Sequence, residues 1–441
     1  MKLYPDNHLS EDQAKLIHIQ AGEVFTPRTP ISNSELFAGR WTEINQLVDA
    51  VNEVGLHVVL YGERGVGKTS LANVIPILIE VFDSKREPPR DSKRIAVRGN
   101  ANSTDTFSTA WEKVFDEIYW TEDAPSVGFR PTPGVRVVTL REAYGLINRE
   151  LTIEDVRRVL AGLPGSVFVI DEFDRLPKPH ASQFTDLIKA LADSAIDTTV
   201  MLVGVAETVD DLVRDHASIP RALIQIPLHP MKLKELRIIL ENAERKLQIT
   251  FEDDASDRIT FMSQGRPHYT HLVGLLSVRA ACERRVSLIT IADVSKGFEQ
   301  AVQAVDHTIS KLYDDATYSS HSDALWKPVL LACAVAAARE SDPIGYFSPS
   351  AVVEPLSTVL GRQVQISTFN GHLGEFCEDK RSMLGRTGQP RGYRYRFRDP
   401  LVPPYVLMRG VSEGMIRAKD LNSLMHAPKS TVFSTLPQRP S

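Results

Sequence analysis

Apolar side chains along residues 36–205 repeat with two alternating periods. Residues 41–54 place Ile44, Leu47 and Val51 on one helical face, and the run 57–61 is apolar and β-branched, as in a strand. Further helices are predicted over 68–82, 106–119, 153–160 and 181–194, and further strands over 94–97, 166–170 and 199–205. Because strands alternate with helices, the pattern predicts a parallel sheet covered on both faces, interrupted by an irregular insertion over 121–133.

The pattern changes after Pro230, where helical spacing continues without a strand-like run. The helices predicted in this part are 233–248, 254–263, 269–285 and 291–306. From about residue 320 the chain predicts three more helices and then two short strands, and these helices are 324–339, 348–360 and 367–378. The N-terminal segment is polar, with one helix predicted over 10–20 and Ser10 as its N-cap. The tail from Leu421 is rich in Ser and Pro and predicts disorder.

Composition places the chain among ordinary globular proteins. Its 441 residues carry 51 Lys and Arg against 56 Asp and Glu, a net charge of −5, with 42% hydrophobic and 24% charged residues. These values exclude a disordered chain, a collagen-like chain and a strongly basic packaging protein. The three cysteines, Cys282, Cys333 and Cys377, match no metal or disulfide spacing. With no apolar leader after Met1 and no apolar run longer than 329–338, the sequence predicts a cytoplasmic protein without a membrane segment.

A glycine-rich string after the first strand is the strongest chemical signal. It fits G-x-x-x-x-G-K-[ST], with a strand before it and a helix after it. Its glycines allow successive backbone N–H groups to face one anion, and the helix that follows adds its N-terminal dipole. Lys68 is predicted to contact the β- and γ-phosphates, and the Thr69 hydroxyl to bind Mg²⁺. The residues predicted to bind the nucleotide here are Gly62, Glu63, Arg64, Gly65, Val66, Gly67, Lys68, Thr69 and Ser70.

Two adjacent carboxylates close the apolar strand 166–170. Asp171 is predicted to hold Mg²⁺ through water, and Glu172 to orient and deprotonate the attacking water, since phosphoryl transfer depends mainly on positioning and charge neutralisation. An acidic helix cap after a strand is the alternative. For Asp174 and Arg175 a local ion pair and a catalytic role both remain open. A γ-phosphate sensor is expected after the strand 199–205, at Glu207 or Thr208, although Thr208 equally suits a helix N-cap.

These strings resemble AAA+ ATPases of the origin-recognition (initiator) type, a clade adjacent to the STAND signalling ATPases. Residues 36–40, Leu-Phe-Ala-Gly-Arg, resemble the hhGR element of those families, which implies that Gly39 and Arg40 lie near the adenine. Residues 265–267, Gly-Arg-Pro, resemble the GxP motif of STAND proteins at the start of a lid helix. The resemblance therefore implies nucleotide contacts from Pro267 and His268, with His268 roughly where the family's sensor-2 arginine is expected.

The resemblance also implies a role in trans for one arginine and a division into domains. Arg221, in the string Ser-Ile-Pro-Arg, is interpreted as an arginine finger that reaches the nucleotide of a neighbouring subunit; an exposed arginine at a strand end is the alternative. The fold class implied is an α/β P-loop AAA+ parallel-sheet domain, followed by an all-helical lid domain and a winged-helix domain. The predicted divisions are an N-terminal extension (1–33), the ATPase base (34–228), the lid (229–312), the winged helix (313–418) and a disordered tail (419–441).

The predicted C-terminal hairpin carries the most basic stretch of the chain. Period-2 alternation puts aromatic residues on one face and arginines on the other over residues 393–398. The arginines predicted to contact DNA phosphates are Arg391, Arg394, Arg396 and Arg398. Two alternatives remain open, because winged helices also bind proteins and because charged edge strands block edge-to-edge pairing.

The sequence therefore predicts an enzyme that hydrolyses ATP to ADP and phosphate with Mg²⁺, as an AAA+ switch whose nucleotide state repositions a winged-helix domain. Duplex DNA is the expected target of that domain, and a homo-oligomer is expected if Arg221 acts in trans. The alternative is a STAND-like signalling or scaffold ATPase that regulates an effector protein encoded by a neighbouring gene, for example in bacterial defence against phage. The intact Asp171–Glu172 pair argues against a protein that binds nucleotide without turnover.

Overall fold

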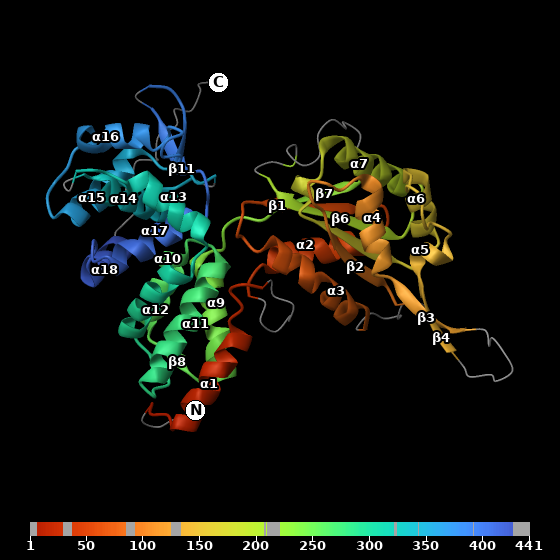
Figure 1. Cartoon of the computed structure of the whole chain (residues 1–441), viewed down its shortest axis with the longest axis horizontal. Coiled ribbons are helices and arrows are strands. Elements are labelled where there is room, and N and C mark those ends of the chain that lie inside the picture. The colour runs from red at the N-terminus through yellow and green to blue at the C-terminus, as the bar shows by residue number, and fades with distance from the viewer. Residues whose placement is uncertain are drawn as a thin grey trace, which may run out of the picture. The chain divides into compact units, whose positions relative to one another are not determined.

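The computed structural model divides the chain into two compact units. It describes residues 7–29, 38–84, 93–124, 134–206, 209, 221–321, 324–342, 344–390 and 392–426. One unit comprises Thr29–His229, and the other combines Met1–Arg28 with Pro230–Ser441 (Figure 1). No described helix combines the length and the apolar character needed to cross a bilayer.

A five-stranded parallel sheet forms the centre of the first unit. The strands are ordered β2-β5-β6-β1-β7. Their bounds are β1 His57–Gly62, β2 Ile95–Asn100, β5 Ser166–Asp171, β6 Thr198–Val205 and β7 Leu223–Pro227. Every neighbouring pair is parallel. The predicted α/β fold with a parallel sheet is therefore confirmed.

Successive residues of each central strand enter opposite hydrophobic cores. Val58 and Leu60 pack in one core with α2 (Trp41–Asn52) and α3 (Lys68–Ser84). Val59 points into the other, aromatic-rich core. The helices of that core are α4 (Phe107–Asp116), α6 (Ile153–Ala161) and α7 (Lys178–Asp193). Figure 1 shows helices on both faces of the sheet. Buried strands of this kind have near-continuous apolar sequences, which explains why they were readable from the chain.

The described part of the insertion between α4 and α6 contains an antiparallel ribbon. β3 (Tyr119–Ala124) pairs antiparallel with β4 (Gly134–Thr139), and the short helix α5 (Leu140–Ala143) follows. The expectation of an irregular segment over 121–133 was therefore wrong for its described residues, 121–124. The ribbon extends away from the sheet, so its residues do not show the half-buried alternation by which a strand is usually predicted.

The second unit begins with a bundle of helices. They are α9 Leu233–Leu247, α10 Asp253–Ser263, α11 Pro267–Glu283, α12 Ile291–Ala304 and α13 His307–Thr317. The expectation of an all-helical lid was wrong in one detail, since β8 (Thr250–Phe251) and β9 (Leu288–Ile289) form a parallel pair. Two residues are too few to show a period in the sequence.

The N-terminal helix α1 (Glu11–Val24) belongs to this second unit and packs on α9 and α11. Ser10 is its N-cap, as predicted, and forms a capping box with Gln13. Phe25, directly after the helix, is 1% exposed and lies so close to Gly274 that a Cβ there would stand 2.5 Å from its ring. The segment predicted as an extension therefore has a packed helix of its own.

The C-terminal part has the element order predicted for a winged helix. Its elements are α14 Trp326–Glu340, α15 Pro349–Leu360, α16 Ile366–Glu375, β10 Leu384–Thr387, β11 Arg394–Phe397, α17 Val402–Ser412 and α18 Ala418–His426. β10 and β11 pair antiparallel, so the predicted hairpin is confirmed. The prediction of disorder from residue 419 was wrong for the described residues of α18. That helix buries Leu421 and Leu424, and Asn422 accepts a hydrogen bond from Arg258, so an amphipathic face holds it in place.

Candidate functional site

The glycine-rich loop joins the carboxyl end of β1 to the first turn of α3. Lys68, the first residue of α3, is 8% exposed. Its ammonium donates hydrogen bonds to the carbonyl oxygens of Gly62 (3.0 Å) and Glu63 (2.8 Å). The lysine predicted to contact phosphates is thus held over the loop by the loop's own carbonyl groups.

Glycine is required at the start of the loop by close packing. Gly62 has a φ of 154°, and a Cβ there would stand 2.3 Å from the carbonyl oxygen of Leu228. Gly65 and Gly67 have φ values of 81° and 98°, a conformation that side chains with a Cβ rarely adopt. These torsions let the loop turn sharply before the helix begins.

The residues present fit a nucleoside triphosphate with a divalent cation. A glycine-rich turn that leads into a helix N-terminus offers backbone N–H groups and a positive dipole end to an anion. The carboxylate of Asp171 and the hydroxyl of Thr69 are oxygen donors of the kind that Mg²⁺ prefers. Because β1 and β5 both run parallel to β6, which lies between them, their carboxyl ends meet at one sheet edge.

Arg40 is 4% exposed and holds the phosphate loop through hydrogen bonds. Its guanidinium donates to the carbonyl oxygens of Val66 (3.0 Å) and His229 (2.6 Å), and it pairs with Glu43 at 3.2 Å. Arg40 is also the N-cap residue of α2, with a backbone φ of 64°. The arginine predicted to lie near the adenine therefore positions the phosphate loop through its side chain.

Asp171 ends β5 and is 2% exposed. Its Oδ1 accepts the backbone N–H of Glu172 at 2.8 Å, and its Oδ2 accepts a guanidinium hydrogen bond from Arg98, also at 2.8 Å. Arg98 lies on the neighbouring strand β2 and was not identified from the sequence. Only the register of β2 against β5 brings it beside Asp171.

Glu172 stands at a sharp turn directly after the strand, with a φ of 55°. Phe173 anchors that turn by packing edge-on against Phe184, with ring centroids 5.4 Å apart. The Glu172 side chain is 47% exposed, and its carboxylate pairs with Arg175 at 2.6 Å. Arg175 therefore forms a local ion pair, and its partner is the carboxylate predicted to be catalytic. Asp174 accepts the backbone N–H of Val205 at 2.8 Å.

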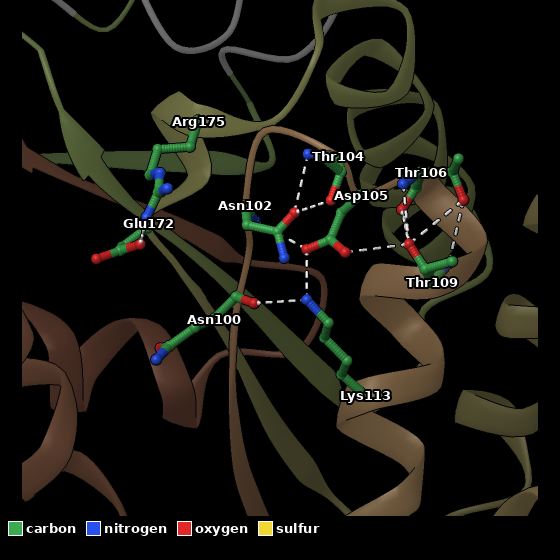
Figure 2. A network of polar contacts seen from close by, with 9 residues as sticks. All are labelled: Asn100, Asn102, Thr104, Asp105, Thr106, Thr109, Lys113, Glu172 and Arg175. Carbon is green, nitrogen blue, oxygen red and sulfur yellow. Dashed lines mark hydrogen bonds and ion pairs between the residues drawn. The ribbon is translucent and has the colours of Figure 1, made fainter.

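A polar network that the sequence did not reveal holds the loop after β2 in place (Figure 2). Asp105, 5% exposed, accepts hydrogen bonds from Lys113 (2.6 Å) and from the backbone of Asn102 (2.8 Å). The backbone N–H of Ala101 donates to the carbonyl oxygen of Asp171 at 2.8 Å. The network therefore ties the end of β2 to the end of β5.

Arg221 lies exposed in the turn before β7. The register places Leu223 opposite His57, at the opening of β1, whereas the phosphate loop follows Gly62 at its other end. At about 3.3 Å per residue the two ends of β1 are separated by roughly 17 Å. Arg221 thus lies away from the phosphate loop of its own chain.

The remaining predicted nucleotide contacts lie in the second unit. Pro267 is the first residue of α11, preceded by Gly265 with a φ of 75°. The Nδ1 atom of His268 contacts the carbonyl oxygen of Pro27, and burial lowers the pKa of this imidazole. Glu207, Thr208 and Arg391 lie outside the described residues.

The hairpin alternates as predicted but uses its arginines internally. Along β11, Tyr395 and Phe397 are buried, whereas Arg394 and Arg396 are half-buried. Arg394 pairs with Asp342 at 2.8 Å.

Arg398 donates from Nε to the carbonyl oxygen of Leu384 and from Nη1 to the hydroxyl of Ser382, each at 3.0 Å. The guanidinium of Arg396 lies 4.9 Å from the ring centroid of Tyr346. The predicted stripe of outward arginines is therefore largely engaged within the unit.

Comparison with known proteins gives one family. A family model described as Novel STAND NTPase 1 matches residues 30–317. No curated protein sequence matches significantly.

Similar solved structures include a Walker-type ATPase of Pyrococcus abyssi, with 14% identity and a TM-score of 0.48, covering 87% of this chain and 99% of that one. The Aeropyrum pernix ORC1 protein in complex with DNA has 14% identity and a TM-score of 0.45, and the match covers 88% of this chain and 95% of that one. The Holliday junction branch migration motor RuvB of Thermotoga maritima has 18% identity and a TM-score of 0.41, with 84% and 95% covered.

Proposed function

This chain belongs to the novel STAND NTPase 1 family, and we propose on that premise that it is a molecular switch driven by ATP binding and hydrolysis with Mg²⁺. One observation carries the proposal. A buried lysine inside a glycine-rich loop and an adjacent Asp–Glu pair lie at the same edge of one parallel sheet. Loop, lysine and paired carboxylates are the parts that phosphoryl transfer from a nucleotide requires.

Each side chain has a distinct part in this proposal. The loop N–H groups and Lys68 bind the phosphates, Thr69 and Asp171 hold the cation, and Glu172 orients the attacking water and accepts its proton. The cation, when bound, neutralises charge on the phosphate oxygens. Glu172 is suited to its part because its side chain is half-exposed, while the packed Phe173 fixes the backbone beside it.

The first test separates binding from hydrolysis. Lys68→Ala is expected to lower ATP affinity by at least about tenfold, because the charge that faces the phosphates is lost. Glu172→Gln is expected to keep ATP affinity and to lower turnover by a factor of at least about 100, the usual contribution of a general base. Calorimetry measures the first effect and phosphate release the second.

The control is Arg157→Ala, which removes a half-buried arginine paired with Glu154 on α6 and should change neither quantity. Unaltered ATP affinity in the Lys68 variant would refute the proposed site.

The output of the switch is proposed to be regulation of a partner protein, such as the product of a neighbouring gene. Two features of the second unit favour a protein target. Arg394 and Arg398 are engaged within the unit. Helix α16, which follows α15 as a recognition helix would, carries no Lys or Arg. Recognition of DNA phosphates depends on such cations.

DNA binding through the hairpin is a second candidate, favoured by one exposed arginine. Arg386 is exposed, with its guanidinium 5.1 Å from the ring centroid of Tyr393. Arg396 stacks similarly on Tyr346. The cation–π contact of Arg386 does not use the hydrogen bonds that a phosphate would accept.

A further inference from the structure

Arg98 is a charged residue at the candidate site that the proposed mechanism does not use. Its guanidinium has partners on three different elements. It pairs with Asp171 on β5 at 2.8 Å, donates to Asn100 on β2 at 2.9 Å, and donates to Asn73 on α3. The Arg98 side chain is 25% exposed and the Asp171 side chain 3% exposed. Arg98 is therefore a partly buried part of the site.

Asn73, one of the partners of Arg98, lies on the same helix as Thr69. Asn73 lies four residues after Thr69, so the two side chains lie on the same face of α3, one turn apart. Arg98 therefore connects the helix that carries one proposed cation ligand with the carboxylate that is the other. Both oxygens of Asp171 already have a partner, since Oδ1 accepts the N–H of Glu172.

The charges around Asp171 oppose a cation that arrives alone. Arg98 neutralises the carboxylate, Lys68 adds a second positive charge at the same sheet edge, and Glu172 is neutralised by Arg175. Like charges repel more strongly at a partly buried site than in bulk water, because the effective dielectric constant is lower there. A triphosphate would reverse this balance because it brings several negative charges.

We propose that Arg98 is a positioning residue that excludes divalent cations from Asp171 until a nucleotide is present, so that the cation enters together with the triphosphate. The inference rests on the proposed cation site at Thr69 and Asp171. Exclusion by Arg98 would make the switch respond to the metal–nucleotide complex and would keep free Mg²⁺ out of the site.

The experiment measures Mn²⁺ binding by electron paramagnetic resonance on the full chain, first without nucleotide and then with ADP. Wild-type protein is expected to bind Mn²⁺ weakly alone and tightly with ADP. Arg98→Met should bind Mn²⁺ at least about tenfold more tightly than wild type without nucleotide. Mn²⁺ alone should also raise the melting temperature of this variant more than that of the wild type, because it replaces the lost partner of a buried carboxylate.

The chain offers a matched control in Arg94. Arg94 also joins α3 to the β2 segment, through a bidentate pair with Asp83 at 2.6 and 2.8 Å, but at the end of the helix remote from the phosphate loop. Arg94→Met should lose stability and leave Mn²⁺ affinity unchanged. Asn73→Ala, which keeps the Arg98 charge and removes one anchor, should give a smaller gain of about threefold.

The outcomes separate the two hypotheses. Absence of Mn²⁺ uptake by wild-type protein with ADP would refute the proposed cation site itself. If wild type takes up Mn²⁺ with ADP but folded Arg98→Met binds Mn²⁺ alone no more tightly than wild type, the role of Arg98 is overturned. If Arg98→Met does not fold, the comparison rests on Asn73→Ala, and unchanged Mn²⁺ affinity in that variant overturns the role equally.

Discussion

Buried polar side chains at single positions fix the loops of the site. Arg40 binds two carbonyl groups at the phosphate loop and at the end of β7, and Asp105 binds the loop after β2. A buried polar backbone group costs free energy unless it has a hydrogen-bond partner, so such side chains are what allows irregular loops at a sheet edge. His57 is likewise a buried polar side chain that provides a hydrogen-bond partner for a backbone N–H, that of Val200 in β6.

His57 makes the stability of the first unit depend on pH. It is fully buried, its Nδ1 accepts the N–H of Val200 at 3.0 Å, and burial lowers its pKa to about 4. At a pH well above 6.5, the ordinary pKa of histidine, the imidazole is neutral in both states and contributes no proton-linked difference. As the pH falls from about 6.5 towards 4, the unfolded chain takes up a proton that the folded chain does not, so the free energy of unfolding decreases.

The expected loss is about 2 kcal/mol between about pH 7 and pH 5, measured by denaturant unfolding. His57→Asn should reduce this loss by about the same amount, since its amide oxygen can still accept the Val200 N–H and does not titrate. Equal acid sensitivity of the two proteins would show that His57 is not the origin. Both proteins retain His271 in the second unit, and burial lowers the pKa of that histidine to about 4 as well. The acid sensitivity due to His271 is therefore the same in both proteins.

Elements of the second unit acquire their roles from what they pack against. The hairpin β10–β11 has the alternation that suits a DNA-binding wing, yet Arg394 and Arg398 bind Asp342 and a backbone carbonyl within the unit. These two arginines therefore support the hairpin, while Arg386 and Arg396 stack on tyrosine rings.

The hairpin gives a sharp test of the DNA candidate. Replacing both Arg386 and Arg396 by Ala should lower affinity for duplex DNA by at least about tenfold and reduce the dependence of binding on salt, if the wing contacts phosphates. Fluorescence anisotropy at two salt concentrations measures both. The matched control is Lys15→Ala on α1, an exposed cation paired with Glu11.

DNA affinity that is absent in wild type, or unchanged in the double variant, would remove the wing from the DNA candidate. The protein-partner proposal would then be the one to pursue.

At the scale of the whole molecule, we propose that a second copy of the chain supplies a cation to the candidate site. Among the described residues at this end of the sheet, Arg64 and Lys68 belong to the phosphate loop, while Arg98 and Arg175 are paired with Asp171 and Glu172. The exposed Arg221 lies near the opposite ends of the strands, and the proposal assigns it to the nucleotide of the second copy. Hydrolysis is therefore proposed to require self-association.

Mixing of variants tests this arrangement. Arg221→Ala should keep ATP affinity and lose hydrolysis by a factor of about 1,000, as expected for an arginine finger. Adding Lys68→Ala protein, which retains Arg221 but not nucleotide binding, should restore part of the phosphate release. Hydrolysis that is independent of protein concentration and normal in Arg221→Ala would exclude the role in trans.

The sequence by itself determined the features that short windows encode. The phosphate loop follows from the backbone freedom of Gly62, Gly65 and Gly67, and the strand that ends in Asp171 follows from an uninterrupted apolar run. The helix α1 was readable because its cap, Ser10, lies three residues from its partner. In each case the cause and its effect lie within a few residues of each other.

Only the tertiary structure decided which charges meet. Arg98 and Asp171 are 73 positions apart and become partners through the register of β2 against β5. Arg394 reaches Asp342 only because the hairpin folds back onto the segment before α15. Helix α18 in the tail is stabilised by burial of Leu421 and Leu424. Long-range pairing depends on which surfaces the sheet and helices bring together, and no local period carries that information.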